Sequence, residues 1–161
     1  MRRLILIRHA KSDWSAALED HARPLNARGR RSAPLIGAWL QEAGYLPGEV
    51  ICSDAARTRE TFDGLGIDAP ASYTRLLYHA EAPDILEVLR AASAETVALI
   101  GHNPGIGDFA GWIVATPPAH PRFHDYPTAA TLVAEFAIDN WRDADFGMAR
   151  ALDFVIPREL E

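Results

Sequence analysis

Short, continuous apolar runs alternate along this chain with segments in which apolar residues recur at helical spacing. The runs predict strands at residues 3–8, 49–53 and 96–101, with a shorter extended piece near 71–76. Continuous apolar runs of this length are typical of parallel strands that are buried on both faces of a sheet. The pattern therefore predicts an α/β protein with a mostly parallel central sheet.

The first helix is marked by a capping residue at each end. Asn26 is placed to cap its amino terminus, and the helix is expected to end near Gly44, a residue suited to a left-handed C-terminal position. Pro34 lies inside this pattern, where proline removes an amide donor and crowds the preceding turn. It either kinks the helix or marks a restart with Ser32 as a second cap.

Three more helices are expected between and after the strands. Asp54 is placed to cap a helix at roughly 55–64, residues 82–84 begin a third helix, and a fourth follows Pro104 with one apolar face. Helices that alternate with parallel strands cover both faces of the sheet. The predicted fold is a three-layer α/β/α sandwich.

The carboxyl-terminal part of the chain has a different pattern. Residues 131–136 and 150–156 are predicted strands with no helix between them, so we expect them to pair antiparallel and give the sheet an antiparallel edge strand. Residues 115–128, rich in proline and histidine, are expected to form a long surface loop.

Length and composition indicate one domain over residues 1–161. The chain is 48% hydrophobic and 24% charged, which is enough apolar material for a buried core. Cys52 is the single cysteine, so no internal disulfide can form and a reducing compartment is favoured. No segment approaches the roughly 20 apolar residues that a membrane span requires. We expect a cytoplasmic protein that does not bind membranes.

Charge is distributed unevenly. The net charge of −6 argues against a general nucleic-acid binder. Residues 1–60 nevertheless carry ten Arg and Lys against seven Asp and Glu, whereas residues 61–161 carry six against fifteen. Lys11 is the only lysine, and the planar guanidinium of arginine suits bidentate contacts with phosphate. The basic part of the chain therefore contains the residues that would bind an anion.

Three predicted strand ends deliver basic side chains. Arg8 and His9 follow the first strand, Arg57 lies just after the second, and His102 follows the strand at 96–101. Ligand sites of open α/β sheets form at these carboxyl ends. A neutral imidazole can accept a phosphoryl group. Nearby arginines would keep His9 unprotonated, and a backbone carbonyl would fix its tautomer.

The same segments resemble the motifs of the histidine phosphatase superfamily, also called phosphoglycerate-mutase-like. Arg8-His9-Ala10 is similar to its Arg-His-Gly signature, with alanine in place of glycine. Ser53 to Thr61 resembles its second element, in which serine, arginine and threonine recur at intervals of four. Gly101-His102-Asn103 resembles the third. The chain length and the Arg-His-Ala variant are similar to the small SixA-type branch, which includes phosphohistidine phosphatases of signalling proteins.

This resemblance implies a role for each main site residue. His9 would be the nucleophile, Arg8 and Arg57 would bind the phosphoryl oxygens, and His102 would donate a further hydrogen bond. It implies a phosphatase that needs no metal and no cofactor and forms a phosphohistidine intermediate on the enzyme. The expected substrate is phosphohistidine on a signalling protein, and a phosphate-type anion is expected to bind in the pocket.

Five further residues are weaker candidates for substrate binding. Arg23 precedes a proline in a segment similar to one that reaches the phosphate pocket in the small branch, or it is a surface arginine. Ser12 and Ser15 either line the rim or are ordinary loop residues, and Asn103 follows His102 in the third motif. Glu81 falls where larger relatives place a general acid. Otherwise it stabilises the start of a helix through the helix dipole.

Other readings stay open at this point. A small-molecule phosphomonoesterase would need an acid such as Glu81 to protonate an alkoxide leaving group. A catalytically silent phosphate-binding module would keep the same basic residues, whereas a mutase is disfavoured because the chain lacks large insertions. His120 and His124 have the spacing of a helical metal pair, but the prolines around them argue against a helix, and no metal site is expected.

Overall fold

A six-stranded mixed sheet forms the centre of the molecule in the computed structural model, which describes residues 1–161. Its order is β3-β2-β4-β1-β5-β6. The bounds are β1 (Arg2–Arg8), β2 (Glu49–Ser53), β3 (Ala71–Thr74), β4 (Thr96–Gly101), β5 (Thr131–Phe136) and β6 (Arg150–Val155). The first four strands are parallel, and β5 runs antiparallel to both β1 and β6. The predicted antiparallel pairing of the last two strands, β5 and β6, is confirmed. The strand that runs opposite to its neighbours is β5, which lies one position in from the edge strand β6.

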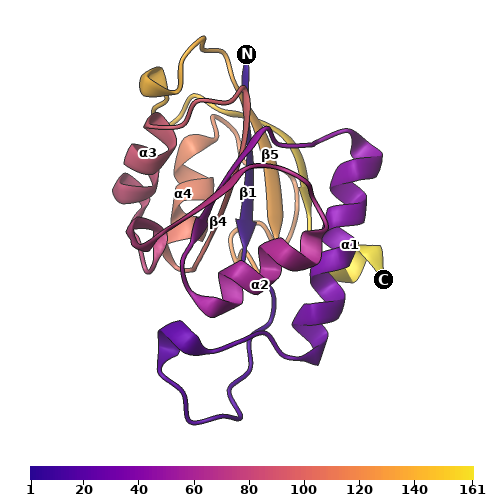
Figure 1. The fold of residues 1–161 in the computed structure, drawn as a ribbon. Helices are drawn as coiled ribbons and strands as arrows, with labels where there is room; N and C mark the ends of the chain where they lie inside the picture. The colour runs from indigo at the N-terminus through magenta and orange to yellow at the C-terminus, as the bar shows by residue number, and fades with distance from the viewer.

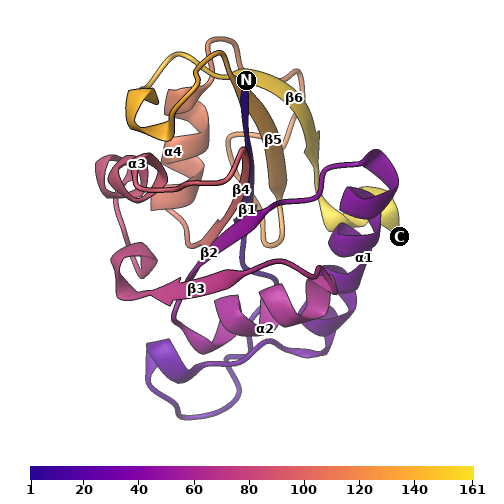
Figure 2. The ribbon, with the colours of Figure 1, turned by 45° about the horizontal axis from the view of Figure 1, so that its top comes forward.

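Two helices cover each face of the sheet (Figures 1 and 2). Helices α1 (Ala27–Ala43) and α2 (Ala56–Leu65) pack together on one face, and α3 (Ala82–Arg90) and α4 (Gly105–Ile113) on the other. Alternate residues of β1 belong to the two cores: Leu4 and Leu6 pack with α3 and α4, whereas Ile5 and Ile7 pack with α1. The three-layer α/β/α prediction is therefore confirmed. No helix has both the length and the hydropathy needed to cross a lipid bilayer.

Helix α1 has the caps that the sequence predicts. The Asn26 side chain accepts a hydrogen bond from the Gly29 amide at 2.9 Å, and Gly44 ends the helix with φ of 76°. Pro34 lies inside one continuous helix. The restart at Ser32 is wrong, because its hydroxyl donates to the carbonyl of Arg28 within the helix instead of capping a new one.

The prediction that Asp54 caps α2 is also wrong. Ala55 occupies the N-cap position, and no side chain caps the helix. The Asp54 carboxylate is instead bound by His21 Nε2 at 2.7 Å. This contact ties the end of β2 to the segment between β1 and α1.

Residues 115–128 are not simply a surface loop. Phe123 and Tyr126 are fully buried and join the core between the sheet, α3 and α4. The Tyr126 hydroxyl bonds to the Leu6 carbonyl and accepts from the Leu132 amide, so it links the adjacent strands β1 and β5. The polar and proline-rich composition of the segment concealed these two buried rings.

Candidate active site

The register of the sheet brings the two predicted histidines together. Arg8, the last residue of β1, lies opposite Gly101, the last residue of β4. The following residues, His9 and His102, therefore leave the sheet side by side, and the His9 amide donates to the Gly101 carbonyl at 3.1 Å. Their ring centroids are 5.3 Å apart. Both lie at the carboxyl end of the parallel strands, at the bottom of the sheet in Figure 1.

The second motif places Arg57 against the same strand ends. Ser53 ends β2 beside β4, and Arg57 and Thr61 follow at intervals of four, on one face of α2. The Thr61 hydroxyl accepts from the Ala10 amide at 2.9 Å and donates to the Arg57 carbonyl at 2.7 Å. The helix that carries Arg57 is thereby fastened to the loop that carries His9.

These side chains line one cavity of about 250 Å³. All four principal residues of the sequence prediction border it. The complete lining consists of Arg8, His9, Lys11, Ser12, Trp14, Asp20, Arg23, Arg57, His79, His102, Asn103 and Thr128.

The geometry of His9 suits a nucleophile. Its Nδ1 lies 2.7 Å from the Ala10 carbonyl oxygen, which can only accept, so the ring proton is on Nδ1 and the lone pair is on Nε2. Burial, together with the charges of Arg8, Arg57 and Arg23, lowers the pKa of His9 to about 3, against the opposing effect of the Ala10 hydrogen bond. The imidazole is therefore neutral at physiological pH.

His102 presents the opposite function to the cavity. Its Nε2 lies 2.8 Å from the Ser53 hydroxyl, which itself accepts from the Ala55 amide and can donate its proton to the ring. Burial lowers the pKa of His102 to about 2, helped by His9 and Arg57. The neutral ring then carries its proton on Nδ1, which is a hydrogen-bond donor.

Buried donors without a partner concentrate at this site. Four buried side-chain nitrogens in the protein have no hydrogen-bond partner: Arg3 Nε, Arg8 Nε, Arg57 Nε and His102 Nδ1. The last three belong to side chains that line the cavity. An unpaired buried donor costs about 1–3 kcal/mol. An oxyanion in this cavity is the kind of ligand that would satisfy such donors.

Asp20 is the main site residue that the sequence reasoning missed. Its Oδ2 accepts from Arg57 Nη2 at 3.0 Å, from His79 Nε2 at 2.9 Å and from the Tyr78 hydroxyl, and its Oδ1 accepts from Arg23. Partial burial alone would raise the pKa of Asp20, but these hydrogen bonds outweigh it and hold the pKa well below its usual range. The cavity thus contains a carboxylate that stays ionised.

Arg23 lies in the cavity lining and is buried. Its guanidinium donates to Asp20 Oδ1 and to the Ser12 hydroxyl at 2.8 Å, and it stacks 3.5 Å from the centre of the Trp14 ring. Asp20 begins the short 3-10 turn that ends just before Arg23. Asp20 lies three residues before Arg23, and this spacing of an acidic and a basic residue was the one sequence signal that pointed to Asp20.

The side chain of Asn103 borders the cavity but is committed to the backbone. Its amide donates to the carbonyls of Asp125 and Tyr126, and its oxygen accepts from the Gly107 amide. These bonds attach the loop after β4 to the segment around residue 126.

Two of the weaker candidates lie outside the cavity lining. Ser15 is exposed, and both its hydroxyl and its amide bond to Asp13 within a local turn. Glu81 is exposed at the N-cap of α3, where its amide is paired with Asp84. The structure therefore brings neither side chain to His9.

No cluster of three or more His, Cys, Asp and Glu is arranged to hold a metal ion. His120 pairs instead with Glu159 at 2.9 Å.

Comparison with known proteins supports the family resemblance. Residues 4–78 match the family model of the histidine phosphatase superfamily (branch 1), a range that contains the first two motifs and ends before His102. An uncharacterised protein of Mycobacterium tuberculosis is 34% identical over 94% of this chain and 100% of its own length.

Solved structures agree over almost the whole chain. A protein from Nakamurella multipartitia described as a SixA phosphohistidine phosphatase superposes with a TM-score of 0.82 at 32% identity, covering 97% of this chain and 96% of its own. The protein histidine phosphatase SixA complexed with tungstate has the same fold, with a TM-score of 0.80 at 20% identity and 99% coverage of both chains. The protein is therefore a phosphatase with phosphorylated substrates, and it belongs to the histidine phosphatase superfamily, in its SixA-type branch.

Proposed function

We propose that this phosphatase hydrolyses phosphohistidine on a signalling protein, through a phosphoryl group carried transiently by His9 and without a metal ion. The observation that carries the proposal is the pairing of a free His9 Nε2 lone pair with unpaired donors on Arg8, Arg57 and His102 around one cavity. Phosphoryl transfer depends mainly on positioning and on stabilising charge over the equatorial oxygens. The side chains gathered here can supply both.

The acid groups of the site favour a phosphoramidate substrate. An alkyl phosphate needs a protonated acid to help its alkoxide leave, whereas the imidazole of phosphohistidine leaves with much less help. Glu81 lies outside the cavity lining, and the one carboxyl group within it, Asp20, is held ionised by its hydrogen bonds. Glu81 is therefore not placed as a general acid would be, and Asp20 does not carry the proton that one would donate.

In the first step, His9 Nε2 attacks the phosphorus atom of the substrate. A bond forms between Nε2 and phosphorus, and the bond between phosphorus and the substrate imidazole breaks with its electron pair leaving on that ring. The leaving ring takes up a proton from solvent, and the phosphorylated His9 ring keeps its proton on Nδ1, where the Ala10 carbonyl accepts it. Arg8, Arg57 and His102 Nδ1 stabilise the charge on the equatorial oxygens during transfer.

In the second step, a water molecule attacks the phosphorus of phosphorylated His9. Its hydroxyl group forms the new bond to phosphorus, and the bond to Nε2 breaks with its electron pair returning to Nε2, which restores the neutral His9 ring. The remaining proton of the water is released to solvent. The Ala10 carbonyl holds the ring in the same orientation through both steps, because it bonds Nδ1 and leaves Nε2 free. Inorganic phosphate then leaves the cavity.

A protein substrate fits the rim of the cavity. Trp14 is 73% exposed although it stacks on the buried guanidinium of Arg23. Large aromatic side chains that stay exposed beside a site are enriched where proteins dock. Trp14 therefore gives the phosphoprotein an apolar contact next to the phosphoryl pocket.

The test is a substrate panel of a histidine-phosphorylated protein, an aryl phosphate and an alkyl phosphate, each assayed with and without EDTA. We expect turnover of phosphohistidine to exceed that of the alkyl phosphate and to be unchanged by EDTA. His9→Ala should lower turnover by about 10⁴-fold or more, as expected for loss of a nucleophile.

His124→Ala is the matched control, since His124 is exposed and lies outside the cavity. It should retain wild-type turnover. Full activity of His9→Ala would exclude the intermediate, loss of activity in EDTA would exclude the metal-free reaction, and a preference for alkyl phosphates would indicate a phosphomonoesterase.

A further inference from the structure

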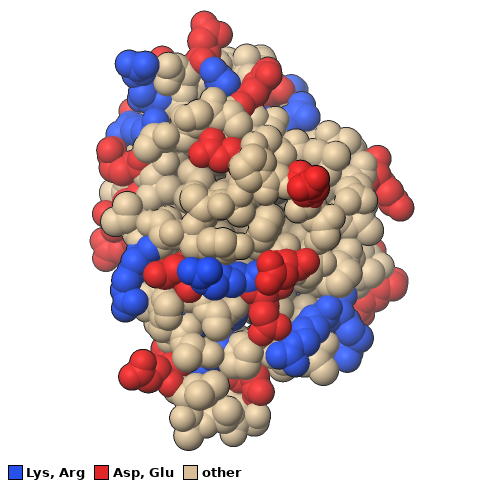
Figure 3. Space-filling model, viewed as in Figure 1, with Lys and Arg blue, Asp and Glu red and all other residues tan.

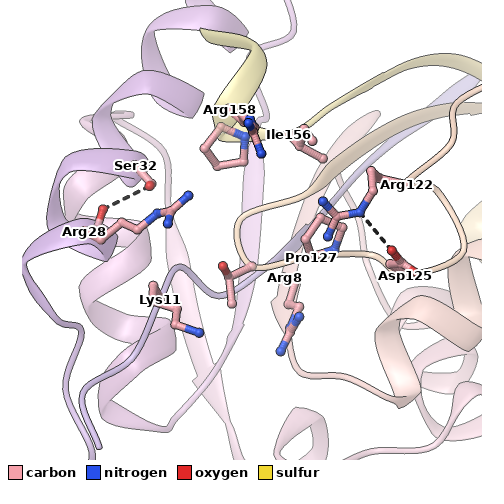
Figure 4. A pocket seen from close by; sticks show the side chains of 11 residues that line it. Arg8, Lys11, Arg28, Ser32, Arg122, Asp125, Pro127, Ile156 and Arg158 are labelled. Carbon is pink, nitrogen blue, oxygen red and sulfur yellow. Dashed lines mark hydrogen bonds and ion pairs between the residues drawn. The ribbon is translucent and has the colours of Figure 1, made fainter. Parts of the chain in front are cut away.

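A second cavity, of about 410 Å³, opens beside the first and has a mostly polar lining (Figure 4). Five of its lining residues are basic, one is acidic, and Ile156 is its only hydrophobic one. The lining consists of Arg8, Lys11, Arg28, Ser32, Arg122, Asp125, Pro127, Thr128, Ile156, Pro157 and Arg158. In Figure 4, Arg28 and Lys11 reach into the space from one side and Arg122 from the other.

Most of these cations have no acidic partner. Arg122 pairs with Asp125 at 2.8 Å, but no carboxylate lies within ion-pair distance of Arg8, Lys11, Arg28 or Arg158. The chain as a whole has a net charge of −6, so acidic residues are abundant elsewhere. Like charges held together without a counter-ion destabilise the folded state. Their concentration in one cavity points to an anionic ligand.

The start of α1 adds to this positive field. The first turn contains Arg28 and no acidic residue, although acidic side chains are favoured at that end of a helix. Figure 3 shows a group of basic side chains over the amino-terminal end of α1. A bound anion would offset both the helix dipole and the unpaired guanidinium.

The walls of this second cavity are fixed by close packing. A Cβ atom at Gly29 would lie only 2.2 Å from the Lys11 carbonyl oxygen, so α1 rests directly on the backbone that carries Lys11. On the opposite side, the Glu159 carboxylate binds both the Ile156 amide at 3.1 Å and His120 at 2.9 Å. The basic side chains therefore extend from a rigid frame.

The two cavities adjoin each other. Arg8, Lys11 and Thr128 line both of them. Arg8 donates from Nη1 to the Tyr126 carbonyl at 3.2 Å, which fixes its guanidinium at the boundary. One ligand can therefore occupy both cavities at once.

We propose that the second cavity binds a second oxyanion of the same substrate, next to the phosphoryl group that enters the His9 cavity. The proposal rests on the proposed function, because it takes the His9 cavity as the site of the scissile phosphoryl group. Charged guanidinium and ammonium groups select a phosphoryl or carboxylate group, and the lining offers only a minor apolar surface, at Ile156 and two prolines. The substrate is thus a phosphorylated molecule with a neighbouring negative charge.

Inorganic tripolyphosphate and orthophosphate are suitable probes, because the longer anion can reach both cavities. Calorimetry should show that the wild-type protein binds tripolyphosphate about tenfold or more tightly than orthophosphate. In the double variant Arg28→Gln/Arg158→Gln this preference should fall to about twofold. The control is Arg31→Gln/Arg142→Gln, which removes two exposed arginines that border neither cavity and have no ion pair. It should keep the wild-type preference.

Two substrate pairs identify the source of the second anion. One compares histidine-phosphorylated peptides whose neighbouring residues are Glu or Gln, and the other compares the mono- and bisphosphate of one short diol. Tighter binding of the more acidic member of either pair supports the proposal if this difference in affinity is lost in Arg28→Gln/Arg158→Gln. No preference in either pair, or a tripolyphosphate preference that survives the double variant, overturns it. Because binding is measured without turnover, inactivity toward phosphohistidine would overturn the proposed function and leave this result unaffected.

Discussion

The rings of His9 and His102 lie 5.3 Å apart, and each has one nitrogen bound to the protein and the other free for a ligand. The free nitrogen of His9 carries a lone pair, because the Ala10 carbonyl fixes its proton on Nδ1. The free nitrogen of His102 carries a proton, provided that Ser53 donates to the other side of the ring. Two neutral imidazoles thus present an attacking group and a donor to the same space.

The first prediction concerns the donor. His102→Asn should lower kcat/KM for an aryl phosphate by about 10²–10³, the effect of losing one preorganised donor to a developing oxyanion. The folded structure should persist, as judged by circular dichroism, because asparagine keeps a polar group beside Ser53. A loss of less than about threefold would show that His102 does not contact the reacting phosphoryl group.

Ser53 should act on catalysis through His102. It is fully buried, and its hydroxyl at 2.8 Å is the only partner of His102 Nε2. Ser53→Ala should therefore shift His102 toward the tautomer with its proton on Nε2, visible in the ¹⁵N chemical shifts of the ring, and lower kcat by about tenfold. Ser53→Thr keeps the hydroxyl and should restore the wild-type spectrum. An unchanged spectrum in Ser53→Ala would contradict this positioning role.

The two histidines should also make stability depend on pH. Their ordinary pKa of 6.5 applies to the unfolded chain, whereas burial lowers the pKa to about 3 for His9 and to about 2 for His102 in the folded protein. Between these values the unfolded chain binds more protons, so stability is complete above about pH 6.5 and decreases as the pH falls. At pH 5 the expected loss is about 2 kcal/mol for each ring.

Urea denaturation at pH 7.5 and pH 5 measures this loss. The variant His9→Gln/His102→Gln lacks both titrating rings, so it should lose about 4 kcal/mol less than the wild type over the same interval. An equal pH dependence in the two proteins would mean that other groups cause the acid sensitivity.

The principal site residues could be predicted because they lie at or shortly after the ends of strands. A continuous apolar run fixes where β1 and β4 end, and parallel pairing then brings His9 next to His102. Arg57 follows from the interval of four in a helix that begins beside its strand. The ends of the predicted strands and the motif spacing of the family resemblance were sufficient to name these three positions.

Asp20 could not be found in this way, because its contacts depend on how an irregular segment crosses the sheet. Its partners Arg57 and Tyr78 lie 37 and 58 positions further along the chain. Nothing periodic in residues 9–26 determines which side chain turns toward the cavity. Tyr126 was missed for a related reason, since its burial depends on a hydrogen bond to Leu6, 120 positions away.

The position of Asp20 leads to the last prediction. Its carboxylate occupies donors of Arg57 and Arg23 that an incoming phosphoryl group also requires, so it competes with the substrate for positive charge. Asp20→Asn removes the negative charge and keeps an oxygen acceptor for one of the two arginines, which bond to different oxygens of the Asp20 carboxylate. Binding of tungstate or orthophosphate should tighten about tenfold, since a like charge a few ångströms away costs on the order of 1 kcal/mol or more.

Asp13→Asn is the matched control for this variant. Asp13 lies in the same segment, its carboxylate is bound only by Ser15 and it does not line the cavity, so the loss of its charge should leave oxyanion affinity within about twofold of wild type. Weaker oxyanion binding in Asp20→Asn would reverse the interpretation. The carboxylate would then serve to hold Arg57 and Arg23 in their productive orientation, and competition with the phosphoryl group would be the smaller effect.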